Sequence, residues 1–231
     1  MTPEVPVTIA REAGPRGEVV LRRRGPHLEL IVNGTFAMDT VDTSTEVALA
    51  RVALENVARP AAVLVAGLGL GFTARAVLAD RRVERLDVVE LEEPLVAWAR
   101  GALDPTLVPE LAHLEDDTRC RLWSADVTAV LAGTEGPSGP WDLVLLDVDN
   151  GPDFLLHEGN AGLYAVAGLR AALAQVAPGG ALVVWSSHRS PQLMEALAAV
   201  AQEAGAAATE RILPVEREGR TLEYALYTAV R

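Results

Sequence analysis

The stretch Val63-Leu64-Val65-Ala66-Gly67-Leu68-Gly69-Leu70-Gly71-Phe72 decides the fold of this chain. It predicts a buried strand that runs into a turn with three glycines and then into a helix. Glycines at such a bend allow a ligand to lie against the backbone, close to the N–H groups at the start of the helix. The spacing is G-x-G-x-G, and Phe72 stands where a dinucleotide-binding fingerprint has its last glycine or alanine. Tight packing of a strand against a helix is the alternative explanation of the same glycines.

A carboxylate follows the next apolar run, at the separation that a βαβ unit requires. The run Arg85-Leu86-Asp87-Val88-Val89-Glu90-Leu91 predicts a second strand, and Glu90 comes 23 residues after Gly67. A carboxylate at the tip of this strand can accept hydrogen bonds from both hydroxyls of a ribose. The alternative is an acid at the start of the next helix, a role that Glu92 and Glu93 fit well. Glu90 fits that role badly, because it directly continues the apolar strand.

Apolar runs alternate with helical patterns from Ser44 onward. Fully apolar strands between helices predict a parallel sheet that is covered on both faces. A polar turn at 217–220 predicts a C-terminal hairpin, which places one antiparallel strand at an edge of the sheet. The expected strands are 61–66, 85–90, 119–123, 141–147, 181–186, 210–215 and 222–230. The expected helices are 44–58, 71–80, 93–101, 127–132, 161–176 and 191–204.

Residues 1–43 differ from the remainder and predict a small β region ahead of one α/β domain over 44–231. The segments 18–22 and 27–32 are strand-like, and the turn signal Asn33-Gly34 follows them. A further short strand over 35–38 completes a small meander.

Composition excludes several classes of function. The net charge of −12 argues against partners such as nucleic acid and anionic membranes. The chain has no apolar run of 18 residues and no basic-then-apolar leader pattern, which predicts a cytoplasmic protein without a membrane partner. Cys120 is the only cysteine, so no disulfide framework forms within the chain. The four histidines lack the spacing of metal ligands, and no metal site is expected.

Acids also follow the third and fourth strands of the α/β region. In such sheets ligands bind beyond the carboxyl ends of the strands. Asp126 follows the strand 119–123 and fits two roles equally well, contact with an adenine amine and capping of a helix. Asp147 and Asp149 directly follow the buried strand that begins at Trp141, with a glycine–proline turn behind them. Packing explains these two carboxylates poorly, so we expect both to be functional.

The order of these features resembles the class I fold that binds S-adenosylmethionine. Two segments, 66–73 and 146–152, make the chain similar to the spermidine synthase-like (polyamine aminopropyltransferase) branch of that fold. Two shorter segments, Leu163-Tyr164 and Val184-Trp185-Ser186, resemble the same branch. The resemblance spans about 28–230. It implies an α/β, Rossmann-like fold with a mostly parallel seven-stranded sheet, an antiparallel C-terminal hairpin and a small N-terminal β region.

The resemblance also implies which residues hold the nucleoside. The glycines would contact its amino-acid or aminopropyl side, the acid of the second strand its ribose, and the acid after the third strand its adenine. The residues implied as nucleoside-binding are Gly67, Gly69, Gly71, Glu90, Leu91, Asp126 and Val127.

On the acceptor side, Asp147 matches the first aspartate of the family's D-x-x-D segment, the base for the attacking amine. The second aspartate of that segment falls on Asn150, next to Asp149. The resemblance therefore implies Asp147 and Asp149 as catalytic residues, and Asn150 and Tyr164 as substrate contacts. The family's glutamine- and tyrosine-containing stretch should fall near 39–54, which contains neither residue here.

Two reactions fit the resemblance, with a small amine as acceptor and a homodimer as the assembly. One is aminopropyl transfer from decarboxylated S-adenosylmethionine, and the other is methyl transfer from S-adenosylmethionine itself. An acidic residue facing the nucleoside tail near 67–71 would exclude the carboxylated form, whereas a basic or neutral residue would admit it. Amine attack on a sulfonium requires alignment, exclusion of water and removal of one proton.

Three further expectations complete the interpretation. The segment 148–160 is expected to be a lid, with His157 in it either assisting proton transfer or lying at the surface. His188, after another strand, is a candidate substrate contact. The other functional classes are an NAD-dependent dehydrogenase, which Phe72 and the C-terminal hairpin disfavour, and a non-catalytic nucleoside-binding relative, which the retained Asp147 and Asp149 disfavour.

Overall fold

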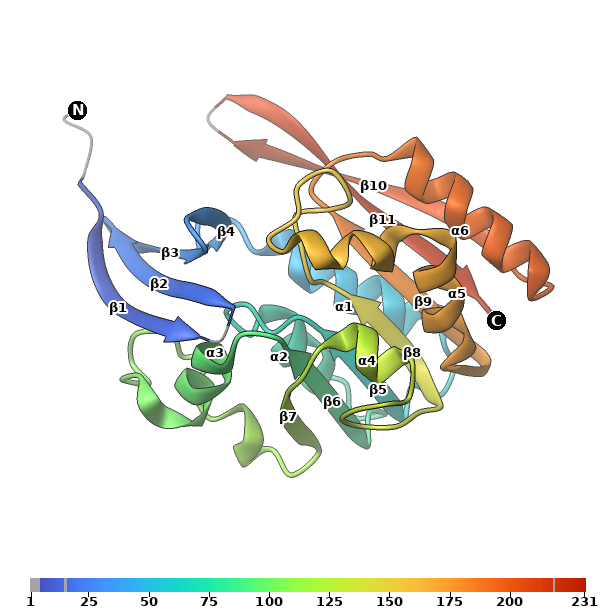
Figure 1. The fold of residues 1–231 in the computed structure, drawn as a ribbon, viewed down its shortest axis with the longest axis horizontal. Coiled ribbons are helices and arrows are strands. Elements are labelled where there is room, and N and C mark those ends of the chain that lie inside the picture. Colours follow the sequence, from blue (N-terminus) through green and yellow to red (C-terminus); the bar gives the residue numbers. More distant parts are fainter. Residues whose placement is uncertain (1–4, 15, 218) are drawn as a thin grey trace.

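The computed structural model describes residues 5–14, 16–217 and 219–231, and it contains two β-sheets. Figure 1 shows the small N-terminal sheet beside the α/β body, and the hairpin of β10 (Ala207–Arg217) and β11 (Arg220–Val230) extending past that body. Residues 1–4 and 15 of the predicted N-terminal region, and residue 218 of the predicted C-terminal turn, lie outside the described residues. No helix in the described part of the chain is both long and apolar enough to span a membrane.

The large sheet has seven strands in the order β10-β11-β9-β8-β5-β6-β7. Five consecutive strands of this sheet, β9, β8, β5, β6 and β7, run parallel to one another. Strand β11 pairs antiparallel with both of its neighbours, β9 and β10. This confirms the predicted class I methyltransferase-like fold with its C-terminal hairpin. The strands are β5 (Ala62–Ala66), β6 (Arg85–Glu90), β7 (Cys120–Ser124), β8 (Trp141–Leu146), β9 (Val176–Ser186), β10 (Ala207–Arg217) and β11 (Arg220–Val230).

Helices cover both faces of this sheet, as fully apolar strands require. Along β5, Val63 and Val65 pack into one core with α1, α2 and α3, whereas Leu64 and Ala66 pack into a second core with α4, α5 and α6. This alternation is the two-residue period of a strand. The helices are α1 (Ser44–Asn56), α2 (Phe72–Leu78), α3 (Glu93–Ala97), α4 (Val127–Leu131), α5 (Val166–Ala174) and α6 (Pro191–Glu203).

The N-terminal sheet has four antiparallel strands, one more than the sequence predicts. They are β1 (Val7–Gly14), β2 (Gly17–Arg24), β3 (His27–Val32) and β4 (Thr35–Asp39). The strand that was not predicted, β1, is largely exposed. Its sequence does not alternate between apolar and polar residues, so no pattern in it predicts a strand with a buried face. Apolar side chains of β2 and β3 join the same core as α1, α2 and α3, which seats this sheet near the carboxyl ends of the large one.

Two predicted helices are broken in the structure. The helix expected at 161–176 is a 3₁₀ helix over Glu158–Tyr164 followed by α5, and the helix expected at 93–101 is α3 followed by a π-helical turn over Trp98–Ala102. Strand β9 begins at Val176, five residues before the predicted start. Short 3₁₀ and π segments keep the apolar spacing of a helix, so the residue pattern alone does not separate them from α-helix.

Candidate nucleoside-binding site

The glycine turn lies between β5 and α2, and its backbone approaches the neighbouring strand tip very closely. Gly67 has φ of +95°, and a Cβ on it would lie 1.9 Å from the carbonyl oxygen of Asp147. Gly69 and Gly67 both line a cavity at this end of the sheet. Gly71 does not line it; a Cβ there would lie 2.6 Å from the carbonyl oxygen of Glu110. Gly71 is therefore required by chain packing at the start of α2.

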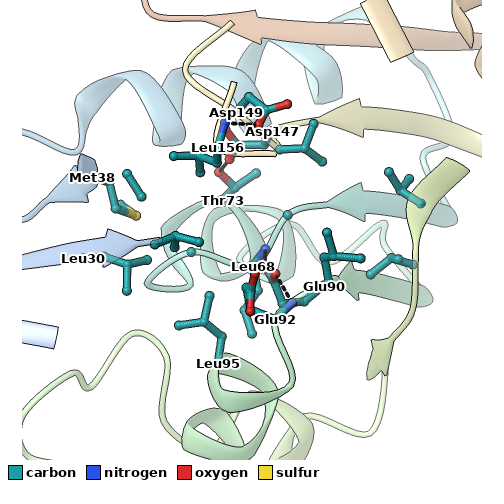
Figure 2. A pocket seen from close by; sticks show the side chains of 18 of the residues that line it. Leu30, Met38, Leu68, Thr73, Glu90, Glu92, Leu95, Asp147, Asp149 and Leu156 are labelled. Atoms are coloured by element: carbon teal, nitrogen blue, oxygen red, sulfur yellow. Dashed lines mark hydrogen bonds between the residues drawn. The ribbon is translucent and has the colours of Figure 1, made fainter. Parts of the chain in front are cut away.

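The acid predicted to hold a ribose ends β6 beside this turn. Glu90 is buried; its Oε2 accepts the N–H of Leu68 and its Oε1 accepts the N–H of Glu92, each at 2.8 Å. Burial raises the pKa of Glu90, and the backbone hydrogen bonds oppose that rise. The dashed lines in Figure 2 mark hydrogen bonds of this kind between the residues drawn. The carboxylate is thus fixed at the tip of β6, with lone pairs left over for hydroxyl donors.

Asp126 fills the capping role, and its position also places it at the cavity. Its side chain accepts the N–H of Thr128 at 2.8 Å as the cap of α4. Arg16, in the connection between β1 and β2, lies 3.3 Å from the other carboxylate oxygen. Leu91 and Val127 line the cavity together with Asp126. The N-terminal sheet therefore closes over the end of the site where an adenine is expected.

Asp147 directly follows β8 and extends the parallel ladder, because its N–H donates to the carbonyl of Ala66. Its Oδ2 accepts the hydroxyl of Thr73 at 2.7 Å, as Figure 2 shows. Burial, followed by the charge of Glu46 and then a smaller contribution from Glu90, raises the pKa of Asp147 to about 7, while the hydrogen bond from Thr73 opposes the rise. A carboxyl group with a pKa near neutrality is suited to accept a proton at physiological pH.

Asp149 is buried and faces its own segment of chain. Its Oδ1 accepts the N–H of Leu156 at 2.7 Å and the amide of Asn160 at 3.2 Å, and its Oδ2 accepts the hydroxyl of Tyr164 at 3.3 Å. Burial raises its pKa, and these hydrogen bonds oppose the rise. Asn150 donates its side-chain amide to the carbonyl of Phe36 at 2.9 Å, which ties the segment to β4. Tyr164 stands behind Asp149 and does not line the cavity.

These side chains surround one cavity, which together with its opening to solvent holds about 920 Å³ of empty space. Met38 of β4 covers the glycine turn, and its sulfur accepts the N–H of Leu70 at 3.3 Å. The charged and titratable groups in the lining are almost all acidic: Glu46, Glu90, Glu92, Asp126, Asp147, Asp149 and His157. No arginine or lysine occurs among the described residues that line it. Gly69, Glu90 and Asp147 thus line the same space, at the carboxyl ends of the strands where such sheets bind ligands.

A second cavity adjoins the first through shared lining residues. Both are lined by Ala37, Met38, Glu46, Asn150 and Trp185. The second cavity adds aromatic side chains and three acids, of which Asp39 pairs with Arg217, and Asp153 lies 2.9 Å from His188. Arg217 also lines it, and the aromatic and acidic residues that it adds to the shared Glu46 and Trp185 are Phe36, Asp39, Asp42, Asp153, Phe154 and Tyr224.

Two glutamates that no sequence pattern indicates, Glu46 and Glu92, also line the cavity. Glu46 lies on the first turn of α1 and faces both cavities, and burial raises its pKa. Glu92 is 3% exposed, and Oε1 lies 2.8 Å from Nε2 of His157, which is itself only partly exposed. Glu90 and Asp147 were predicted because each directly continues or follows an apolar strand. Neither Glu46 nor Glu92 directly follows an apolar run, so this criterion does not identify them. His157 lies against the cavity wall instead of at the surface.

No protein-family model matches the chain. Among curated proteins, the polyamine aminopropyltransferase of Mycobacterium tuberculosis is 30% identical over 196 residues, which are 83% of this chain and 35% of that protein. Polyamine aminopropyltransferase 2 of Streptomyces coelicolor is 39% identical over 88 residues, which are 38% of this chain and 15% of that protein. The chain thus spans about a third of the length of the first of these relatives, and less of the second.

Solved structures of spermidine synthase have the same fold. One, in complex with the transition-state analogue AdoDATO, gives a TM-score of 0.76 at 16% identity, over 97% of this chain and 73% of that one. Spermidine synthase from Thermotoga maritima gives a TM-score of 0.72 at 14% identity, over 97% of this chain and 72% of that one. The fold of this chain is therefore spermidine synthase-like, within the class I methyltransferase architecture.

Proposed function

We propose that this chain, with its spermidine synthase-like fold, is an aminopropyltransferase that uses decarboxylated S-adenosylmethionine and a small amine acceptor. The observation that carries the proposal is the charge of the donor cavity, whose described lining contains acids and no arginine or lysine. The tail of S-adenosylmethionine bears a carboxylate, which would meet Glu46 and Asp147 near the glycine turn without a compensating cation. The decarboxylated tail presents an ammonium and a sulfonium, and both are attracted by these carboxylates.

The reaction is a displacement at carbon. The lone pair of the acceptor nitrogen attacks the aminopropyl carbon that is bonded to sulfur, an N–C bond forms, and the C–S bond breaks with its electron pair going to sulfur. The products are an aminopropylated amine and the neutral thioether methylthioadenosine. The attacking nitrogen loses one proton, which Asp147 accepts. Alignment of nitrogen and carbon can lower the barrier by about 7–11 kcal/mol, more than the roughly 10²–10⁴-fold that a base supplies.

The second cavity is the proposed acceptor chamber. It meets the donor cavity at Glu46, so an amine in it approaches the transferred carbon from the side of Asp147. Its aromatic side chains fit an aliphatic chain, and its acids fit ammonium groups. Asp149 and Asn150 act as positioning residues in this proposal, because their hydrogen bonds hold the segment between the two cavities.

The proposal is tested by incubating the protein with decarboxylated S-adenosylmethionine and a series of aliphatic mono- and diamines, followed by mass spectrometry. A product heavier than the amine by one aminopropyl group, together with methylthioadenosine, supports it. Amine methylation when S-adenosylmethionine is supplied, without aminopropyl transfer, would instead assign the methyl-transfer reaction. Tight nucleoside binding without any product would identify a non-catalytic relative.

Replacing Glu46 by glutamine should reduce the preference for the decarboxylated donor. The substitution removes one negative charge beside Asp147 and keeps the side-chain length, so we expect binding of the decarboxylated nucleoside to weaken about tenfold, or about 1.4 kcal/mol. Binding of S-adenosylmethionine should not weaken. Isothermal titration calorimetry measures both values. Asp42→Asn is the matched control, because Asp42 lines only the acceptor chamber and accepts the N–H of Ser44; an equal effect of both substitutions would refute the assignment.

Donor binding should strengthen as the pH rises toward about 7, the raised pKa of Asp147. Between its ordinary pKa of 3.8 and about 7, the folded protein keeps a proton on Asp147 that the unfolded chain has lost, so this group's contribution to stability falls as the pH rises through that window. A cationic donor binds better to the ionised form of Asp147, so below about pH 7 the protein must release the Asp147 proton when the donor binds. Calorimetry across this range should show affinity rising and then levelling, and Asp147→Asn should flatten the curve. An unchanged curve in that variant would assign the titration to another group.

A further inference from the structure

The C-terminal hairpin contributes a positive charge to the wall of the acceptor chamber. Strand β11 pairs with β9 only from Ala225 onward, and Ala225 lies opposite Ser186, the last residue of β9. The rest of the hairpin extends past the α/β body (Figure 1), beyond the strand ends at which the two cavities lie. Arg217 and Tyr224 from this part line the chamber, and no other arginine or lysine does so among the described residues.

Arg217 pairs with the most buried acid of the chamber. Its guanidinium donates to Oδ2 of Asp39 on β4, and the Asp39 side chain is only 5% exposed. Oδ1 of Asp39 accepts the N–H of Val41 at 3.0 Å, so each carboxylate oxygen already accepts a hydrogen bond. Burial raises the pKa of Tyr224 and the charge of Arg217 opposes that rise, so the tyrosine hydroxyl lies beside the same guanidinium. The buried carboxylate of the chamber is thus neutralised by the protein's own cation.

The other acids of the chamber offer a second ammonium group a weaker site than a free Asp39 would. Asp42 and Asp153 are exposed, and solvent and salt screen their charges. Glu46 is shared with the donor cavity, so it faces the end of the acceptor that reacts. An ammonium at the far end of an acceptor therefore depends on Asp39, which Arg217 occupies.

We propose that Arg217 determines acceptor specificity: by pairing with Asp39, it favours an amine with one ammonium group over a diamine. The guanidinium repels a second ammonium and blocks the buried carboxylate that would otherwise hold it. The uncharged part of the acceptor then lies along the aromatic wall, where the rings of Trp185 and Tyr224 have centroids 5.7 Å apart. This inference rests on the proposed function in requiring an amine acceptor, and it names the class as aliphatic monoamines.

The alternative role of the ion pair is purely structural, because the pair also joins β10 to β4. A role limited to fastening the hairpin predicts that loss of Arg217 changes the binding of all amines alike. A role in specificity predicts a change in the ratio of diamine to monoamine affinity. The two roles are therefore separated by a ratio, which a general loss of stability does not move.

The test measures, by calorimetry, the binding of butylamine and of the terminal diamine of the same chain length to the protein saturated with methylthioadenosine. The wild-type protein should bind the monoamine at least as tightly as the diamine. Arg217→Met removes the charge at similar length and should raise the ratio of diamine to monoamine affinity by at least about tenfold, because two unit charges in contact near a protein surface interact by more than this. Arg217→Lys keeps the charge and should keep the wild-type ratio.

Arg211→Met is the matched control, because Arg211 lies on the same strand, pairs with Glu55 and does not line the chamber. It should leave the ratio unchanged. If Arg217→Met fails to fold, Arg217→Gln gives the same comparison with a neutral side chain that still donates to Asp39. An unchanged ratio in the neutral variant, or tighter binding of the diamine than of the monoamine by the wild-type protein, would overturn the inference.

The outcomes also separate this inference from the proposed function. Amine binding with the predicted ratios but no group transfer would refute the proposed function alone. Group transfer with the same ratio in the wild type and in the neutral variant would refute this inference alone. Absence of both amine binding and group transfer would refute both.

Discussion

Asp147→Asn is expected to lower kcat for group transfer by about 10²–10⁴-fold, the usual contribution of a positioned general base. The variant keeps the shape of the side chain and an oxygen for the hydroxyl of Thr73, which in the wild type donates to Oδ2 at 2.7 Å. It loses the negative charge and the proton acceptor that we propose for the amine ammonium. Asp147→Ala should be more severe, because it also loses alignment of the attacking nitrogen. Steady-state kinetics with saturating donor measure both effects.

Asp149→Asn provides the contrast for this result. Its carboxylate accepts hydrogen bonds from Leu156 and Asn160, which line the cavity, and from Tyr164, which does not, so we assign it the role of positioning this part of the cavity wall. Its kcat should fall much less than that of Asp147→Asn, and thermal unfolding should show a lower melting temperature instead. A larger loss of kcat in Asp149→Asn than in Asp147→Asn, at equal stability, would exchange the two assignments.

Gly67→Ala is expected to destabilise the protein by about 3–5 kcal/mol, since it combines backbone strain with overpacking. Gly67 has φ of +95°, and an added Cβ would lie 1.9 Å from the carbonyl oxygen of Asp147. Backbone atoms at a strand tip cannot move aside as a flexible side chain can. The change would push apart the glycine turn and Asp147, so nucleoside binding should be lost as well. Urea unfolding measures the free energy, and calorimetry measures the binding.

Gly101→Ala separates the two causes. Gly101 has φ of +100°, nearly that of Gly67, but an added Cβ would meet nothing within 4 Å. Its cost is therefore strain alone, about 1–2 kcal/mol. The excess in Gly67→Ala over this control measures the overlap with Asp147. Equal destabilisation by the two substitutions would show that the turn and the strand tip are not held in contact.

Strand tips were predictable because their signal is local. Glu90 and Asp147 directly follow apolar runs, and parallel strands bring their carboxyl ends to one edge, so sequence order alone placed these acids near the glycine turn. The seven-stranded sheet followed from the same runs. The prediction for Gly71 shows the limit of this reasoning, because its neighbour Glu110 lies in a connection whose path no pattern in the sequence defines.

Residues that reach the site across the fold were not predictable. Glu46 belongs to α1 and Met38 to β4. Their positions in the cavity wall depend on how the N-terminal sheet and α1 pack against the large sheet. Glu92 fits a helix cap by its position in the sequence, and only the closed surroundings formed by Gly14 and His157 distinguish it. Such contacts join segments far apart in the chain, where periodicity carries no information.

The central claim is that an acid-lined cavity selects a nucleoside whose tail carries no carboxylate. Calorimetric titration of one protein preparation with decarboxylated S-adenosylmethionine and with S-adenosylmethionine tests it most directly. The account predicts tighter binding of the decarboxylated compound by at least about tenfold, or about 1.4 kcal/mol. Equal affinities, or tighter binding of S-adenosylmethionine, would contradict it.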